Sequence, residues 1–212
     1  MMRGMYRLYA LRGSCSLASH ILLEELGLPF EVRLLDLEKE EDRDLLFSKN
    51  PLGLVPVLEF PDGARLTQNL AILLHLASQA KDRKLFPEPG TMEHARAMEW
   101  MALLATNVHT SFTPFFRPGR YHPEEGEVQR VREKAVEQIE KVFSVMESRA
   151  PESGWFLGAE FSLVDLYHFV FFRWLRVVGV DEARFPKLRR LAQAVREREA
   201  TQRALLRENI RR

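Results

Sequence analysis

Several features that mark other protein classes are scarce in this sequence. Its 212 residues include one cysteine, Cys15, which excludes an intramolecular disulfide and a redox cycle between two cysteines of the chain. Lys and Arg number 31 and Asp and Glu number 30, so the formal net charge is +1. Proteins that bind nucleic acid need a basic surplus for the phosphate backbone. We therefore expect no nucleic-acid partner.

Long apolar runs are missing as well. The most apolar stretch, residues 169–172, ends at Arg173 and is far shorter than the roughly 20 apolar residues that span a bilayer. Near the start of the sequence, Arg7 and Arg12 interrupt the apolar residues that a secretory signal would need. We expect no membrane segment and a cytoplasmic protein.

Metal-ligand spacing is the third absence. The six histidines are scattered along the chain, and the single cysteine has no second thiol near it. His20 lies in an apolar stretch, so we interpret it as a core residue. The sequence predicts no metal site.

The composition is that of a globular protein, with 46% hydrophobic and 29% charged residues. Along the chain the composition changes once, near residues 80–90. The first part alternates strand-like and helical patterns, whereas the rest is helical throughout. Expected strands cover residues 6–11, 30–35, 55–60 and 64–66, and expected helices cover 17–26 and 68–77. A β-α-β crossover followed by a hairpin predicts an α/β domain with a mixed four-stranded sheet. The form of residues 43–49 stays open.

The second part follows a charged, proline-broken segment that no helix can continue through. We predict an α/β domain over residues 1–80, a linker over 81–90 and an all-α domain over 91–212. Ser162 and Asp165 have the spacing of a capping box before a central apolar helix. The Arg-rich segment 196–212 alternates with glutamate and is interpreted as a solvated helix face.

Cys15 lies where the first strand turns into the first helix. A thiol there faces the positive end of the helix dipole, which lowers the pKa of a thiol and favours a reactive thiolate. Free cysteine is also common as a small buried hydrophobe. From position alone the two readings are about equally supported, and both stay open.

Two further segments have weaker signals. Val55 and Pro56 begin an expected strand, where a cis proline would leave the backbone of Val55 open to an extended ligand, but the residues alone favour an ordinary trans proline. Gln68 and Asn69 lie at a helix start, where amide groups attract anions, although polar residues there are usually only caps.

Taken together, these motifs resemble those of the bacterial beta-class glutathione transferases. The resemblance covers essentially the whole chain. Its segments are Leu8-Tyr9, Gly13 to His20, Asn50 to Leu58, Asp62-Gly63 and Leu66 to Gln68, followed by Glu99-Trp100, Val108-His109, Phe112 to Pro114 with Phe116, and Gly158 to Asp165.

The resemblance implies a thioredoxin-like domain that binds glutathione as co-substrate, an all-α helical domain that helps to bind an apolar co-substrate, and a homodimer. It implies a cis Pro56, with the backbone of Val55 paired to the cysteinyl part of glutathione. The implied catalytic residues are Cys15, Ser16, Tyr9 and His109. The implied glutathione-binding residues are Leu54, Val55, Pro56, Gln68, Asn69 and Lys39, and the implied co-substrate pocket includes Phe112 and Phe116.

Three positions depart from the class pattern. Gln68 replaces a common glutamate, a change that other glutathione transferase classes share. Asn107 replaces a glutamate that reaches across the dimer toward the ligand. Glu40 stands where the class offers a lysine for the glycyl carboxylate, which leaves Lys39 or Arg43 as the replacement.

We therefore predict an enzyme that conjugates the glutathione thiolate to small apolar electrophiles, with thiol-disulfide exchange through Cys15 as a variant. A non-catalytic interaction module on the same fold is the alternative from another class. A glutathione-dependent isomerase or dehalogenase is a third possibility, because the co-substrate pocket carries no readable code.

Overall fold

A computed structural model describes residues 4–80, 84–121 and 124–210. The chain divides into two compact units, Met1–Phe86 with Val195–Arg212, and Pro87–Ala194. The end of the chain therefore differs from the expected division, because the last helix belongs to the unit that contains the sheet. Residues 81–83 of the expected linker lie outside the described residues.

The first unit is built on a mixed sheet, as the sequence predicts. The strand order is β2-β1-β3-β4, with β1 and β2 parallel and the other neighbours antiparallel. Residues 40–49, whose form the sequence left open, are helical. The elements of this unit are β1 (Tyr6–Ala10), α1 (Ser16–Leu26), β2 (Phe30–Leu34), α2 (Glu40–Lys49), β3 (Val57–Glu59), β4 (Arg65–Thr67), α3 (Asn69–Ser78) and α10 (Glu199–Arg207).

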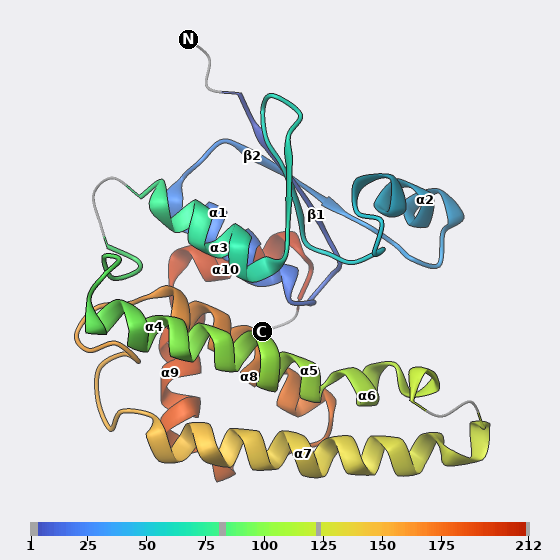
Figure 1. The fold of residues 1–212 in the computed structure, drawn as a ribbon, viewed down its shortest axis with the longest axis vertical. Coiled ribbons are helices and arrows are strands. Elements are labelled where there is room, and N and C mark those ends of the chain that lie inside the picture. Colours follow the sequence, from blue (N-terminus) through green and yellow to red (C-terminus); the bar gives the residue numbers. More distant parts are fainter. Residues whose placement is uncertain (1–3, 81–83, 122–123, 211–212) are drawn as a thin grey trace. The chain divides into compact units, whose positions relative to one another are not determined.

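Different helices cover the two faces of the sheet, because neighbouring strand residues point to opposite sides. Helices α1, α3 and α10 pack together, and α2 lies apart from them (Figure 1). Tyr9 points toward α2, where it packs in a cluster with Leu35, Leu46 and Val57. The turn from β1 into α1, which carries Cys15, is thus held at the edge of a fully packed sheet.

Arginines of the C-terminal segment fix α10 to α1. Arg198 forms a bidentate pair with Glu25, with N···O distances of 2.6 and 3.0 Å. Arg203 and Arg207 both reach Glu24, at 2.8 and 3.1 Å. Arg203 and Arg207 are exposed, as a solvated helix face predicts, but all three arginines also pair with acidic residues of a helix that is distant in sequence.

The second unit is helical. Helices α4 to α6 follow one another alongside α7 (Figure 1). Within the described residues, no helix combines the length and the apolar character needed to cross a membrane. The elements are α4 (Met92–Ala102), the π-helical turn η1 (Leu103–Val108), α5 (His109–Ser111), α6 (Thr113–Phe116), α7 (Val128–Arg149), α8 (Leu163–Val177), α9 (Pro186–Arg196), and short 3₁₀ turns at Pro118–Arg120, Glu125–Glu127 and Glu182–Arg184.

The predicted capping box begins α8, the central helix of this unit. Asp165 accepts hydrogen bonds from the Ser162 backbone N–H at 2.9 Å and the Ser162 hydroxyl at 2.6 Å. It also accepts one from the Phe156 N–H at 2.9 Å. Burial nevertheless raises the pKa of Asp165 to about 6, because desolvation outweighs these donors.

His168, on the same helix, is completely buried between Phe156 and Phe172, and neither ring nitrogen has a hydrogen-bond partner in the described structure. Burial lowers its pKa to about 3, so the fold holds the neutral ring. The unfolded chain takes up a proton on this ring near pH 6.5, whereas the folded protein does not, so the free energy of unfolding falls as the pH drops below about 6.5. We expect His168→Leu to stabilise the protein by about 1 kcal/mol at pH 7 and by about 2 kcal/mol more at pH 5.

Urea unfolding of wild type and His168→Leu at the two pH values measures this effect. His94→Leu, at a half-buried histidine of α4, is the comparison variant. If the free energy of unfolding changed equally with pH in wild type and His168→Leu, the result would contradict the burial of an uncharged ring.

Candidate active site

Cys15 is the N-terminal capping residue of α1, and its side chain is 6% exposed. Its thiol donates a weak hydrogen bond to the Val55 carbonyl oxygen at 3.7 Å. Its own carbonyl oxygen accepts a bond from the Asn69 side-chain amide at 2.8 Å. The sulfur therefore lies at the positive end of a helix, between the loop before β3 and the start of α3.

The Val55-Pro56 peptide bond is cis, as the resemblance implies, so the trans proline favoured by the residues alone is wrong. Among the described residues, no protein acceptor pairs with the Val55 N–H. The neighbouring Leu54 carbonyl is already occupied, because it accepts a bond from Asn50 Nδ2 at 2.7 Å. An extended ligand can thus pair with the backbone at Val55, next to the thiol.

Gln68 is exposed and has a φ of +68°, in the left-handed region that costs a non-glycine residue about 1–3 kcal/mol. Backbone strain of this kind is concentrated at ligand sites. Asn69 next to it is buried, with its amide oxygen accepting from Ser19 at 2.5 Å and its amide nitrogen donating to Cys15. Its side chain holds α3 to α1, which leaves the backbone N–H as the ligand-facing group.

Two predicted catalytic side chains have other partners. The Ser16 hydroxyl is buried, 2.6 Å from the Ser14 hydroxyl and 3.3 Å from the Leu11 carbonyl oxygen that accepts from it. Tyr9 lies under the ammonium of Lys49, which is 5.1 Å from its ring centroid. The Glu59 carboxylate and, to a smaller extent, the Tyr9 hydroxyl raise the pKa of that lysine. The structure thus gives Ser16 a supporting place in the turn and Tyr9 one in the sheet.

Two basic residues near Glu40, Lys39 and Arg43, are candidates for binding a ligand carboxylate, and they differ in their protein partners. Both carbonyls of Leu37 and Glu38 accept hydrogen bonds from Arg43, at 2.8 and 3.0 Å, so its guanidinium holds the loop before α2. Lys39 is exposed and has one distant pair, with Asp36 at 3.9 Å. Of the two candidates for a ligand carboxylate, Lys39 is the available one.

His109 belongs to the second unit and directly follows the π-helical turn η1. Its ring packs on Phe171 and Trp174, with centroid distances of 5.1 and 5.6 Å. Burial, with a smaller effect of the Arg117 charge, lowers the pKa of His109 below its usual value. The ring is therefore neutral at physiological pH and can exchange a hydrogen bond.

Threonine hydroxyls explain the wide turn before His109. The Thr106 hydroxyl donates to the Ala102 carbonyl oxygen at 2.9 Å, and the Thr110 hydroxyl donates to that of Thr106. Such side-chain bonds satisfy carbonyls that a π turn removes from the regular helical pattern. The sequence spacing of the buried Leu104, Val108 and Phe112 gives no hint of this turn.

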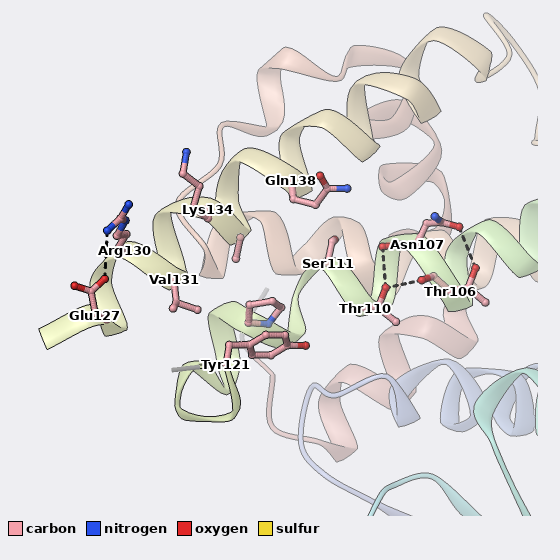
Figure 2. A pocket seen from close by; sticks show the side chains of 12 residues that line it. Thr106, Asn107, Thr110, Ser111, Tyr121, Glu127, Arg130, Val131, Lys134 and Gln138 are labelled. Carbon is pink, nitrogen blue, oxygen red and sulfur yellow. Dashed lines mark hydrogen bonds and ion pairs between the residues drawn. The ribbon is translucent and has the colours of Figure 1, made fainter. Parts of the chain in front are cut away.

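Phe112 and Phe116, the two residues implied for the co-substrate pocket, differ in burial. Phe112 is completely buried in the helical core, against Phe143 and Trp174. Phe116 is 44% exposed and packs edge-on against Trp174 at 5.4 Å. Neither residue lines the groove of about 740 Å³ that the structure shows in this unit (Figure 2). That groove is lined by Thr106, Asn107, Thr110, Ser111, Pro114, Tyr121, Glu127, Arg130, Val131, Lys134, Ala135 and Gln138.

Glu208 is a supporting residue that sequence reasoning missed. It is fully buried, and one carboxylate oxygen lies 2.8 Å from His20 Nδ1. The other oxygen accepts from the Gly13 N–H at 2.8 Å, in the turn that leads to Cys15. The three residues are brought together only by the docking of α10, so no local pattern could have shown it. His20 is a buried residue, as expected.

In the described part of the chain, no three His, Cys, Asp or Glu side chains gather as they would to hold a metal ion. The first unit instead brings together a helix-terminal thiol, an open backbone edge at Val55 and the strained Gln68. These groups fit a short extended peptide that carries a thiol and an anionic end.

Most of the chain is similar to known proteins. Residues 4–78 match the domain family "Glutathione S-transferase, N-terminal domain", and residues 101–199 match "Glutathione S-transferase, C-terminal domain". Glutathione S-transferase GstA of Escherichia coli O157:H7 is 34% identical over 96% of this chain and 99% of its own. The beta-class glutathione S-transferase of Sphingomonas chungbukensis is 31% identical, with a TM-score of 0.86 over 97% of this chain and 100% of its own. A sphingomonad glutathione S-transferase solved with glutathione has a TM-score of 0.85, 31% identity and the same coverage.

Proposed function

Since the chain belongs to the glutathione S-transferase family and is a glutathione transferase, we propose that it conjugates the glutathione thiolate to small apolar electrophiles. In this proposal, residues 1–80 bind glutathione and residues 91–212 contribute to the co-substrate site. A cytoplasmic homodimer completes the proposal, as the resemblance implies. The observation that carries it is the placement of Cys15, Val55 and Gln68 around one open edge of the first unit.

Each group has a role that follows from its chemistry. The Val55 backbone pairs with the cysteinyl part of glutathione and aligns its sulfur beside Cys15. Gln68 and the Asn69 N–H, at the start of α3, bind the γ-glutamyl carboxylate. Lys39 attracts the glycyl carboxylate. Ser16 supports the turn from within, Tyr9 supports the sheet below it, and His109 remains a predicted catalytic residue of the helical unit.

The N-terminal end of α1 favours a negative sulfur at this place, whether it belongs to glutathione or to Cys15. In conjugation, the glutathione thiolate attacks the electrophile, a carbon–sulfur bond forms and the leaving group departs with the electron pair of its broken bond. In the exchange variant, the Cys15 thiolate attacks a glutathione mixed disulfide and releases the other thiol. A second glutathione then resolves the Cys15 mixed disulfide and leaves as oxidised glutathione.

Gln68 provides a test of the glutathione site. We expect Gln68→Ala to raise the KM for glutathione about tenfold, the loss of one hydrogen bond to a charged group, with a smaller change in kcat. Gln68→Glu should keep binding close to wild type if the resemblance to the class holds. Gln79→Ala, at the other end of α3, is the matched control.

The activity itself is tested by initial rates with reduced glutathione and a chlorodinitrobenzene, alongside rates with a glutathione mixed disulfide. Turnover of the chlorinated compound that saturates with glutathione supports conjugation. A purified, folded protein that turns over neither compound contradicts the proposed substrates.

A further inference from the structure

The segment that follows α10 folds back onto the turn that carries Cys15. Asn209 has a φ of +51°, and the N–H of the next residue, Ile210, donates to the Leu205 carbonyl oxygen at 2.9 Å. This is a Schellman ending, in which one left-handed residue after the helix reverses the direction of the chain. Asparagine tolerates that conformation better than most residues. The reversal brings residues 208–210 against the turn.

Each of these three residues contacts the turn in a different way. The buried Glu208 carboxylate accepts a hydrogen bond from the Gly13 N–H at 2.8 Å. The Asn209 carbonyl oxygen accepts one from the Arg12 guanidinium. Ile210 lies against Gly13, where an added Cβ atom would be 3.7 Å from Ile210 Cδ1. We call Glu208, Asn209 and Ile210 the α10 clamp.

The clamp holds a turn that can otherwise change its conformation easily. Gly13 has a φ of +66°, and a glycine has no Cβ to restrict it to that region. Cys15 follows two residues later with its side chain only 6% exposed. A sulfur that attacks a disulfide or another electrophile needs access to its reaction partner. Covalent chemistry at Cys15 therefore requires local opening of the turn, which the contacts of the clamp oppose.

We propose that Arg12 and the α10 clamp position Cys15 and control how often its thiol becomes accessible for covalent reaction. In the closed turn the thiol donates to the Val55 carbonyl oxygen at 3.7 Å. In the open turn it can attack a disulfide or another electrophile. The clamp thus favours conjugation over thiol-disulfide exchange. That consequence rests on the proposed function, whereas the accessibility of the thiol does not.

Alkylation measures the accessibility directly, because Cys15 is the only cysteine of the sequence. Its thiolate displaces iodide from iodoacetamide, forming a carbon–sulfur bond. We expect Arg12→Ala to raise the alkylation rate constant about tenfold, the effect of one lost charge-assisted hydrogen bond on a local opening equilibrium. Removing a positive charge from the turn would by itself disfavour the thiolate and slow the reaction, so charge alone cannot produce the expected rise.

Two further variants separate the clamp from general stability. Ile210→Ala removes the side chain against Gly13 and should raise the rate about threefold, because part of an apolar contact is lost. Arg203→Ala is the matched control. Arg203 is also an exposed arginine that joins α10 to α1, but it binds the side chain and the carbonyl oxygen of Glu24, at 2.8 and 3.2 Å, toward the other end of α1 from Cys15.

The control should stay within about twofold of the wild-type alkylation rate. Circular dichroism of each variant establishes that the protein is folded under the conditions of the assay. An unchanged rate in Arg12→Ala would overturn the proposal. An equal rise in Arg12→Ala and Arg203→Ala would do so as well, because it would assign the effect to the docking of α10 as a whole.

Rates with glutathione separate this inference from the proposed function. Arg12→Ala should raise exchange with a glutathione mixed disulfide about tenfold, in step with alkylation, and leave conjugation of a chlorodinitrobenzene within about twofold. Faster alkylation with unchanged exchange would overturn the control of exchange by the clamp. Faster alkylation of a protein that turns over neither compound would support the clamp and contradict the proposed function. Turnover of the chlorinated compound, with alkylation that Arg12→Ala leaves unchanged, would do the reverse.

Discussion

Replacing Cys15 by alanine abolishes thiol-disulfide exchange, with a fall of at least about 100-fold, while conjugation falls only about tenfold. The two effects differ because exchange needs the Cys15 sulfur as a covalent participant. In conjugation the attacking sulfur belongs to glutathione, and we expect Cys15, whose thiol donates to the Val55 carbonyl oxygen at 3.7 Å, to stabilise it without forming a bond to it. Parallel assays of one preparation with a glutathione mixed disulfide and with a chlorodinitrobenzene measure the ratio.

Cys15→Ser is the matched variant, because it keeps a donor of similar size without a reactive thiol. It should restore part of the conjugation and none of the exchange. The catalytic role of Cys15 fails if alanine leaves both glutathione binding and both rates unchanged. Circular dichroism of each variant excludes unfolding as the cause of a loss.

The second large effect is on stability, at Glu208. We expect Glu208→Ala to lower the free energy of unfolding by about 3 kcal/mol, because it leaves the buried His20 ring and the Gly13 N–H without their acceptor. For a protein of this size that corresponds to a Tm lower by roughly 6–12 °C. Thermal unfolding followed by circular dichroism measures it.

Glu199→Ala lies at the start of α10, whose C-terminal capping residue is Glu208, but removes a side chain that is 96% exposed, so its effect should stay within about 0.5 kcal/mol. Glu208→Gln keeps one acceptor oxygen and should fall between the two. Equal melting temperatures for Glu208→Ala and Glu199→Ala would mean that α10 does not hold the Cys15 turn.

The mixed sheet was predictable because its strands carry local signals. Apolar runs, the β-α-β order and the Pro61-Asp62-Gly63 turn each reflect backbone rules that act within a few residues. Helix α2 was not, because only Asp42 and Leu46 of its ten residues are buried, too few for a helical apolar pattern. The cis state of Pro56 was likewise invisible in the residues alone and followed only from the resemblance.

The site was predictable as a set of positions but less so as a set of contacts. Cys15, Val55 and Gln68 lie at the ends of strands and helices that the local sequence patterns predict. Asn69 and Ser16 differ, since burial commits their side chains to protein partners. Arg203 and Glu208 have partners that are distant in sequence. Arg203 binds Glu24, 179 residues earlier, and Glu208 binds His20, 188 residues earlier. Patterns within a window cannot report such pairings.

The central claim is that the first unit binds glutathione at the edge formed by Cys15, Val55 and Gln68. Calorimetric titration of the purified protein with reduced glutathione at neutral pH tests it directly. We expect a dissociation constant between micromolar and millimolar, about −8 to −4 kcal/mol, that weakens in Gln68→Ala and is unchanged in Gln79→Ala. The absence of heat at two temperatures, with the protein folded, would contradict the claim.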